Sequence, residues 1–360
     1  MSASNPIPPA RAWAEIDLGA LVANARTVSS VSGSRLLPMV KANAYGTGAV
    51  AVTRALESVD PWGYGVVTPE EGATLRRAGI RRPIIVFGAL TEAGADACRR
   101  DELRPVLGDL DAIRRWTGRC EQPFHLEIDT GMRRLGIPWH DAELLAEAGR
   151  LLSGATGWEG IFTHFHSADV EGESARVQWD RLLGALAAFP RRPALVHAAN
   201  SAAAMQGRAF AGDLVRPGIY LYGGAAGLAT GRTVVRFAAP VVASRRLRPG
   251  DTVSYGATWR AGAATTVVTI AAGYADGIPR ALGSRGLIEI GGRAFPIVGR
   301  VTMDFTMVDV GDSEVSPGAD ATIFGGAVSL DAQAAAAGTI SYELLTGLGD
   351  RVQRRHVEAR

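Results

Sequence analysis

Apolar and polar positions follow a repeating order along the first two thirds of the chain. A short apolar run is followed by a polar or Gly-rich turn and usually by a segment with helical spacing. Eight strands mostly separated by helices are typical of a (β/α)8 TIM-type barrel. A doubly wound open sheet is the second candidate, although no G-x-G-x-x-G turn follows the first run. The predicted strands cover residues 36–42, 63–69, 83–89, 104–108, 124–129, 160–166, 194–199 and 214–223.

The pattern changes after about Gly231. Apolar runs with Gly, Pro and Asp at their turns occupy 233–256, 265–273, 286–299 and 302–312, and helical spacing returns only near the C-terminus. We therefore predict two domains. A (β/α)8 barrel would cover 10–230, and a mainly β C-terminal domain would cover 231–360.

Composition narrows the function classes. The 360 residues carry a net charge of +2 with no basic run, which does not favour nucleic acid as a partner. No apolar run is long enough to predict a membrane span, and the N-terminal residues lack the apolar region of a signal peptide. The two cysteines, Cys98 and Cys120, show neither a disulfide framework nor metal spacing. We therefore expect a cytoplasmic protein without a membrane partner.

The chain contains one lysine, Lys41, among 38 basic Lys and Arg residues. Arginine replaces lysine as a surface charge, but its guanidinium offers no nucleophilic amine. Lys41 also falls at the end of the first predicted strand, where barrels place catalytic groups. A lysine extending from a strand end into solvent is the simpler interpretation. The composition favours a lysine that forms a Schiff base.

The segments after the seventh and eighth predicted strands carry anion-binding features. Asn200 and Ser201 begin a short predicted helix, whose free N–H groups suit a phosphate, although a plain helix cap is equally consistent with them. Gly218 allows close approach of the backbone to a ligand. A phosphate site opposite a Schiff-base lysine indicates pyridoxal 5'-phosphate (PLP). A phosphorylated aldolase substrate would need the same two parts.

Other polar residues lie where the barrel mouth is expected. Arg216 interrupts the eighth apolar run, and a charge there needs a buried partner or a ligand. His164 and His197 lie at strand ends, where a histidine is more often a core group than a catalyst. Tyr255 precedes Gly-Ala in the β-rich part and alone indicates only a strand aromatic. No histidine spacing favours a metal.

Together, these segments resemble the alanine racemases, the fold-type III PLP enzymes. The resemblance runs from residue 13 to residue 352. Its motifs, in the order of that family, are VKANAYGTG, DTGMRRLG, THFHSAD, HAANSAA, VRPGIYLYG, VSYGATW, GYADG and GRVTMDFTMVDV.

The resemblance implies a role for each matching residue. Lys41 would form the Schiff base with PLP, and His197 would support Arg216 opposite the pyridine nitrogen. Arg134 would hydrogen-bond the phenolic oxygen of the cofactor. The phosphate would be held by Tyr45, Ser201, Gly218, Ile219 and Tyr342, beside Asn200. From the second subunit of a head-to-tail homodimer would come the catalytic Tyr255, next to His164, and the substrate-end residues Tyr274, Met303 and Asp304.

The implied reaction interconverts L- and D-alanine, with D-alanine supplied for peptidoglycan. Two bases on opposite faces of the substrate, Lys41 and Tyr255, remove and return the α-proton. The cations Arg134 and Arg216 would lower the pKa of both bases. Arg216 would also keep the pyridine nitrogen unprotonated, which disfavours transamination.

Two positions depart from the family pattern. Thr47 stands where many members have histidine, a change that we expect to be tolerated. Glu127 stands where many members carry a carbamylated lysine. We expect its carboxylate to supply the negative charge directly, with no need for bicarbonate. A surface-facing strand glutamate is the alternative.

Three other functions stay open from the sequence. They are a racemase of another small amino acid such as serine, a non-catalytic PLP carrier built from the barrel alone, and a PLP decarboxylase. The β-rich part argues against the carrier. The absence of cysteine from that part argues against the decarboxylase.

Overall fold

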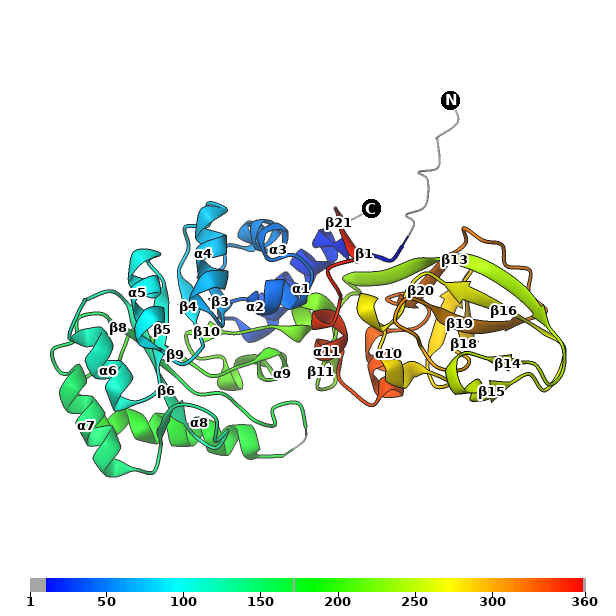
Figure 1. Cartoon of the computed structure of the whole chain (residues 1–360). Helices are drawn as coiled ribbons and strands as arrows, with labels where there is room; N and C mark the ends of the chain where they lie inside the picture. The colour runs from blue at the N-terminus through cyan, green and yellow to red at the C-terminus, as the bar shows by residue number, and fades with distance from the viewer. Residues whose placement is uncertain (1–10, 171, 359–360) are drawn as a thin grey trace. The chain divides into compact units, whose positions relative to one another are not determined.

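Eight parallel strands form the core of the first unit of the chain, Leu21–Arg232 (Figure 1). The computed structural model describes residues 11–170 and 172–358. The strand order is β2-β10-β9-β8-β6-β5-β4-β3, and the short β7 (Ile137–Pro138) pairs with β6. The other strands are β2 (Arg35–Leu36), β3 (Tyr64–Val66), β4 (Ile84–Val86), β5 (Arg104–Leu107), β6 (Phe124–Asp129), β8 (Trp158–Phe162), β9 (Leu195–His197) and β10 (Leu214–Val215).

The two ends of this strand order also meet, which closes the sheet into a barrel. Beyond β2 the chain stays extended, and Met39 forms a parallel bridge with Gly65 of β3. The N–H of Trp62 donates to the carbonyl of Leu36 at 2.8 Å, and the N–H of Val40 donates to the carbonyl of Gly65 at 2.9 Å. The structure therefore confirms the predicted (β/α)8 barrel over the open sheet.

Helices follow most of the strands, and polar caps fix where several of them begin. Thr68 and Glu71 form a capping box on α4, while Asp109 and Asp141 accept backbone N–H groups at the starts of α6 and α7. No helix within the described residues is long and apolar enough to cross a bilayer. The helices are α1 (Leu18–Ser32), α2 (Lys41–Tyr45), α3 (Ala49–Leu56), α4 (Pro69–Arg77), α5 (Glu92–Arg100), α6 (Leu110–Thr117), α7 (Ala142–Leu152), α8 (Ser174–Ala185) and α9 (Ser201–Ala204).

The second unit contains residues 11–20 and 233–358 and is mainly β, as predicted. Its sheet has the order β18-β17-β20-β13-β1-β21, and β16 and β19 pair alongside β13. The elements are β1 (Trp13–Asp17), β13 (Val235–Leu247), β14 (Thr252–Val253), β15 (Trp259–Arg260), β16 (Thr265–Ile270), β17 (Leu287–Ile290), β18 (Arg293–Pro296), β19 (Thr306–Gly311), β20 (Asp320–Phe324), β21 (Gln353–Val357), α10 (Leu330–Ala337) and α11 (Ser341–Thr346).

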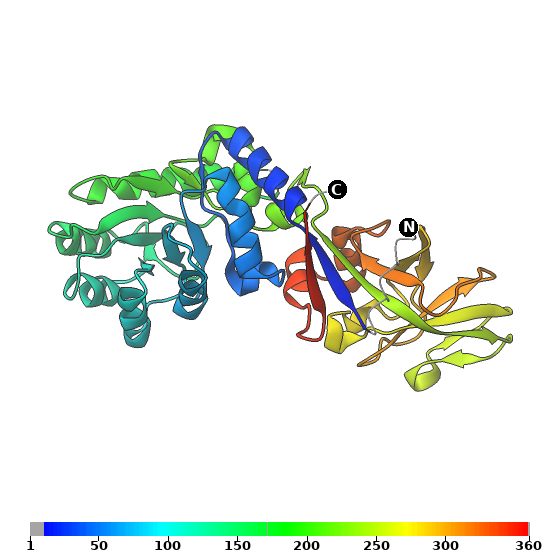
Figure 2. The ribbon, with the colours of Figure 1, turned by 90° about the horizontal axis from the view of Figure 1, so that it is seen from above.

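The division of the chain differs from the predicted boundaries at the N-terminus. Residues 11–20 had been assigned to the barrel, but β1 pairs antiparallel with β13 and parallel with β21. Figure 2 shows β1 in blue between the green β13 and the red β21. The backbone hydrogen bonds of β1 are therefore made to strands that come more than 200 residues later in the chain, a pairing that local pattern does not reveal.

Most predicted strands are shorter than expected, and two of them end in helical turns. The run at 214–223 keeps only Leu214–Val215 as strand, and Ile219–Tyr222 forms a 3-10 helix. The run at 36–42 leaves the extended conformation before Lys41, which is the first residue of α2. Both changes place polar residues in turns beyond the strands.

Candidate active site

The carboxyl ends of the barrel strands bring together the residues singled out in the sequence. Lys41 follows the β2 segment, and His164 follows β8. His197 ends β9, and Arg216 comes directly after β10. Arg134, which follows β6, and Arg216 both lower the pKa of Lys41 through their charges. The structure therefore places these residues at one mouth of the barrel.

The turn that follows Lys41 has a left-handed backbone. Ala42, Asn43, Ala44 and Tyr45 have φ angles of 52°, 53°, 53° and 54°, and none of them is glycine. Each L-residue in this conformation costs about 1–2 kcal/mol. The turn is held by its own hydrogen bonds, including Ala44 N–H to the carbonyl of Val40 at 2.9 Å. Strain maintained by surrounding contacts is characteristic of functional sites.

Glu71 connects this turn to the start of α4. Its Oε1 accepts the N–H of Ala42 at 2.6 Å, and its Oε2 accepts the N–H of Val67 at 2.8 Å. Buried Thr47 donates its hydroxyl to the carbonyl of Ala44. Thr47 therefore adds a hydrogen bond to the turn, and the tolerance of this departure stays a prediction.

The environment of Lys41 favours a neutral amine. Its pKa is lowered from the ordinary value of 10.5, first by burial and then by the charge of Arg134. Glu71 opposes this shift, and Arg216 adds to it. An ammonium that is partly removed from water near two guanidinium groups is disfavoured. The pKa of Lys41 is therefore shifted in the expected direction, toward the deprotonated amine that a nucleophile or a base requires.

Arg216 is buried, with 3% of its surface exposed, and its hydrogen-bond partners are neutral acceptors. Its NH2 donates to the carbonyls of Thr163 at 2.8 Å and Ala198 at 3.0 Å, and it lies 3.3 Å from Nδ1 of His164. Its NH1 lies 2.7 Å from Nδ1 of His197. Burial lowers the pKa of Arg216 to about 10, so the guanidinium remains charged at neutral pH.

The two histidines at the mouth are neutral. Burial and the charge of Arg216 lower the pKa of His164 to about 3, and they hold that of His197 well below its ordinary range. His197 stacks on Phe162 with ring centroids 4.9 Å apart. The predicted support of Arg216 by His197 is therefore present.

Glu127 is buried at 6% exposure on β6, which excludes the surface-facing alternative. Burial raises the pKa of its carboxyl to about 7, while Arg134 and Arg216 act in the opposite direction. The carboxyl therefore lies in the field of both mouth arginines, and its ionisation is poised near neutral pH.

The predicted phosphate corner is assembled by the segments after β9 and β10. Asn200 caps α9 by accepting the N–H of Ala203 at 3.1 Å. The Ser201 hydroxyl oxygen accepts the N–H of Gly218 at 2.8 Å, which leaves its own hydrogen to donate. A Cβ atom at Gly218 would lie 2.2 Å from Oη of Tyr45. The corner also includes buried Ile219, where the 3-10 helix begins.

These residues fit a phosphorylated aldehyde such as PLP. Lys41 provides an amine with a lowered pKa, and Gly218 keeps the backbone bare opposite Tyr45. Ser201 and Tyr45 present hydroxyl groups beside that glycine. Within the described residues, no cluster of His, Cys, Asp or Glu is arranged for a metal ion.

The remaining predicted residues lie in the second unit. Tyr255 is 73% exposed, Met303 53%, Tyr274 44% and Tyr342 42%, so large side chains stand at the surface of this unit. Asp304 accepts NH1 of Arg351 at 2.8 Å. The assignment of these five residues to a shared site stays a prediction.

A buried carboxylate holds the turns that carry Tyr274 and Asp304. Asp276, with no exposed side-chain surface, accepts NH2 of Arg11 at 2.9 Å and NH2 of Arg351 at 3.2 Å. It also accepts the N–H of Gly273 at 2.9 Å. These ion pairs connect the Tyr274 turn to Arg11 before β1 and to Arg351 before β21.

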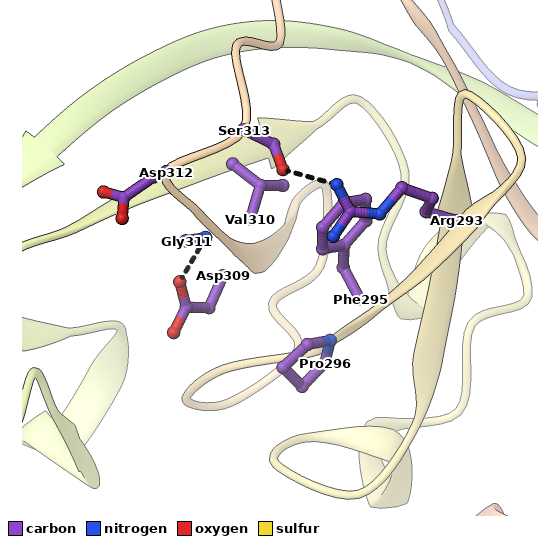
Figure 3. Close-up of a pocket in the computed structure, with 8 residues that line it drawn as sticks. All are labelled: Arg293, Phe295, Pro296, Asp309, Val310, Gly311, Asp312 and Ser313. Atoms are coloured by element: carbon purple, nitrogen blue, oxygen red, sulfur yellow. Dashed lines mark hydrogen bonds between the residues drawn. The ribbon is translucent and has the colours of Figure 1, made fainter.

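A different hollow in the second unit lies over β18 and β19 (Figure 3). Arg293 donates to Oγ of Ser313 at 3.3 Å and lies over the Phe295 ring, and Asp309 accepts the N–H of Gly311 at 3.0 Å. Asp312 accepts NH1 of Arg246 and Asp309 accepts the hydroxyl of Thr265, so the carboxylates of this hollow have partners on neighbouring strands. None of its lining residues is a predicted site residue.

Four polar residues that support the mouth were not predicted from the sequence. Glu71 holds the strained turn, and the other three, Arg104, His125 and Glu159, lie inside the barrel below Arg216. The signal for these three was a polar or charged residue within an otherwise apolar strand.

Replacing Ala42 with glycine tests the left-handed turn. Glycine adopts positive φ without the penalty that alanine carries, which offsets its larger entropy in the unfolded chain. We expect Ala42→Gly to leave the free energy of unfolding unchanged or to raise it by up to about 1 kcal/mol. The control Ala146→Gly, at an exposed position in right-handed α7, should lower it by roughly 0.5–1 kcal/mol. Urea unfolding measures both, and equal losses would contradict the assigned conformation.

Replacing Glu127 with glutamine tests its raised pKa. Between the ordinary 4.5 and about 7, the folded protein retains a proton that the unfolded chain releases. The contribution of Glu127 to stability therefore falls as pH rises through this interval. We expect Glu127→Gln to gain stability relative to the parent between about pH 5 and about pH 8 in urea unfolding. The exposed Glu143→Gln is the control, and parallel pH curves for Glu127→Gln and the parent would refute the shift.

Comparison with known proteins agrees with this site. The family model "Alanine racemase, N-terminal domain" matches residues 16–226, and "Alanine racemase, C-terminal domain" matches residues 234–356. An alanine racemase of Acidiphilium cryptum is 37% identical over 94% of this chain and 97% of its own length. One from Deinococcus radiodurans is 40% identical over 96% and 99%.

Solved structures give the same result. The alanine racemase of Bartonella henselae with covalently bound pyridoxal phosphate superposes with a TM-score of 0.90 at 30% identity. That match covers 97% of this chain and all of the other. The alanine racemase of Streptomyces coelicolor has a TM-score of 0.90 at 33% identity, covering 97% and 98%. With its barrel, its β-rich unit and both family models matched in order, the chain belongs to the alanine racemase family.

Proposed function

We propose that this protein is a PLP-dependent racemase that interconverts L- and D-alanine. The observation that carries the proposal is the single lysine of the chain at the barrel mouth, with its pKa lowered by burial and by Arg134. A family of alanine racemases and a neighbour that binds pyridoxal phosphate covalently support the same activity.

Several barrel residues would each bind a different part of the cofactor. Lys41 would hold it covalently, while Ser201, Gly218 and Tyr45 would receive the phosphate. Arg216 would face the ring nitrogen, and because it keeps its proton it offers a donor that never protonates that nitrogen. The bound cofactor supplies an electron sink that acidifies the α-proton of the substrate.

The proton transfers need one base on each face of the substrate. Lys41 has a lowered pKa and would serve one face. Tyr255 would serve the other face, reached from the second subunit of a head-to-tail homodimer, and its 73% exposure in the isolated chain is what a residue offered to a partner requires. Tyr274, Met303 and Asp304 would come from the same second subunit as Tyr255, whereas Tyr342 would help to hold the phosphate.

Glu127 would present its negative charge to Arg134, in place of the carbamylated lysine that many family members carry. Its burial and the influence of Arg134 on its pKa support this role. Because the carboxyl belongs to the chain itself, activity should not depend on bicarbonate. Both cysteines are free, which supports a reducing, cytoplasmic location. The D-alanine formed there would be supplied for peptidoglycan.

The activity is tested with the PLP-loaded protein. We expect racemisation of alanine to exceed that of serine, lysine and arginine in initial rates. Borohydride reduction followed by peptide mapping should place the cofactor on the peptide that contains Lys41. A preference for serine would replace alanine as the substrate, and bound PLP without any racemisation would indicate a carrier. PLP absent from the Lys41 peptide would refute the proposal.

The shared site is tested by mixing two inactive variants. Lys41→Ala and Tyr255→Phe should each lose nearly all turnover. After mixing and subunit exchange, half of the dimers contain one chain of each kind, and one of the two sites in each would be intact. We therefore expect recovery of about a quarter of the parent activity. If Lys41 and Tyr255 acted within one chain, both sites of a mixed dimer would stay defective and no activity would return.

A further inference from the structure

A column of hydrogen-bonded polar side chains runs inside the barrel to Arg216. At its far end, Nε of Arg104 donates to Oε2 of Glu159 at 2.7 Å, and NH2 donates to Oε1 at 3.3 Å. Nε2 of His125 lies 3.2 Å from the same Oε2. Nδ1 of His125 lies 2.8 Å from Nε2 of His197, whose Nδ1 meets NH1 of Arg216 at 2.7 Å. Five side chains from five strand segments thus form one continuous chain of hydrogen bonds.

The strands place this column along the barrel. Arg104 opens β5, and Glu159 and His125 are the second residues of β8 and β6. His197 and Arg216 lie at the carboxyl ends. The column therefore connects the amino ends of the strands, where Arg104 and Glu159 are 20% and 23% exposed, with the mouth. The middle is dry, because both histidines are fully buried.

The surrounding residues fix the two imidazole rings. Phe162 stacks on His197, and Trp62 contacts the edge of His125 at a centroid distance of 5.8 Å. Gly160 provides the space for His125, since a Cβ there would lie 2.4 Å from its Nδ1. Barrel interiors are normally filled by branched apolar side chains, so this polar column requires its own explanation.

The groups at the two ends of the column determine which ring nitrogen of each histidine carries the proton. The guanidinium of Arg216 has only donors, and the carboxylate of Glu159 has only acceptors. Burial lowers the pKa of both histidines, so each carries a single N–H. Nδ1 of His197 must accept from Arg216, and its Nε2–H then donates to His125. His125 in turn donates its Nε2–H to Glu159.

We propose that Glu159 is a positioning residue for Arg216. Through His125 and His197, its carboxylate fixes the ring tautomer that accepts from NH1, and so fixes the direction in which the guanidinium points. The column is a tautomer lock and not a proton wire, because Arg216 does not release its proton at the mouth. The functional part of this inference rests on the proposed place of Arg216 opposite the cofactor nitrogen.

Exchanging the two charges at the foot of the column, Arg104→Glu together with Glu159→Lys, reverses the lock. The ion pair would remain, and the ammonium introduced at position 159 would donate to Nε2 of His125. His125 would then carry its proton on Nδ1, and His197 would do the same. The N–H of His197 would point at the N–H of Arg216, which would lose this acceptor and shift. The same exchange at Arg82 and Glu57 is the control, because that pair, at 2.8 Å, lies outside the column.

The experiment reads the tautomers directly. In the PLP-loaded parent, labelled with ¹⁵N-histidine, NMR should show His125 and His197 as neutral Nε2–H tautomers throughout about pH 5 to 8. The exchange of Arg104 and Glu159 should move both to Nδ1–H. It should lower kcat for alanine roughly 10- to 100-fold with little change in KM, and it should raise the share of turnovers lost to transamination. The exchange of Arg82 and Glu57 should leave all of these unchanged.

Each outcome separates this inference from the proposed function. A titrating ring, or an Nδ1–H tautomer in the parent, overturns the lock even if the variant with Arg104 and Glu159 exchanged does not fold. Reversed tautomers with unchanged kcat and unchanged transamination overturn the positioning role while racemase activity stands. A parent that shows the predicted tautomers but no racemisation refutes the function and leaves the lock in place.

Discussion

The burial of one guanidinium charge governs the chemistry of the barrel mouth. Arg216 is 3% exposed, and an unpaired charge at that depth is among the most costly groups in a protein. The barrel compensates it with neutral acceptors, the carbonyls of Thr163 and Ala198 and the imidazole of His197. Because none of these partners cancels the charge, a positive field remains at the mouth.

That field acts together with burial on the neighbouring groups. Burial is the main cause that lowers the pKa of Lys41 and of His164, and the charges of Arg134 and Arg216 add to it. The same two charges act against the burial that raises the pKa of Glu127. A direct carboxylate partner for Arg216 would weaken the share of the field that Arg216 supplies.

The sequence was sufficient for the barrel and for the place of Lys41, because apolar runs, turns and composition are local properties. It was not sufficient where partners lie far apart in the chain. The pairing of β1 with β13 depends on the folding of the second unit, and the contact of His125 with Glu159 depends on closure of the barrel. The left-handed turn after Lys41 was hidden for another reason. Ala42 and Ala44 are good formers of right-handed helices, and only the hydrogen bonds around them impose the opposite hand.

The contrast between Lys41 and Arg216 explains why one lysine survives in an arginine-rich chain. Burial acts on both cations, but their intrinsic basicities differ. Arg216, with a pKa near 10, still keeps its proton at neutral pH and so provides a constant charge. The pKa of Lys41 starts from 10.5 and is lowered by burial, by the charge of Arg134 and, to a smaller extent, by that of Arg216, so its proton is more easily transferred. An arginine at position 41 would stay protonated, and a lysine at position 216 would lose the fork that binds two carbonyls and a ring at once. Neither position tolerates the other cation.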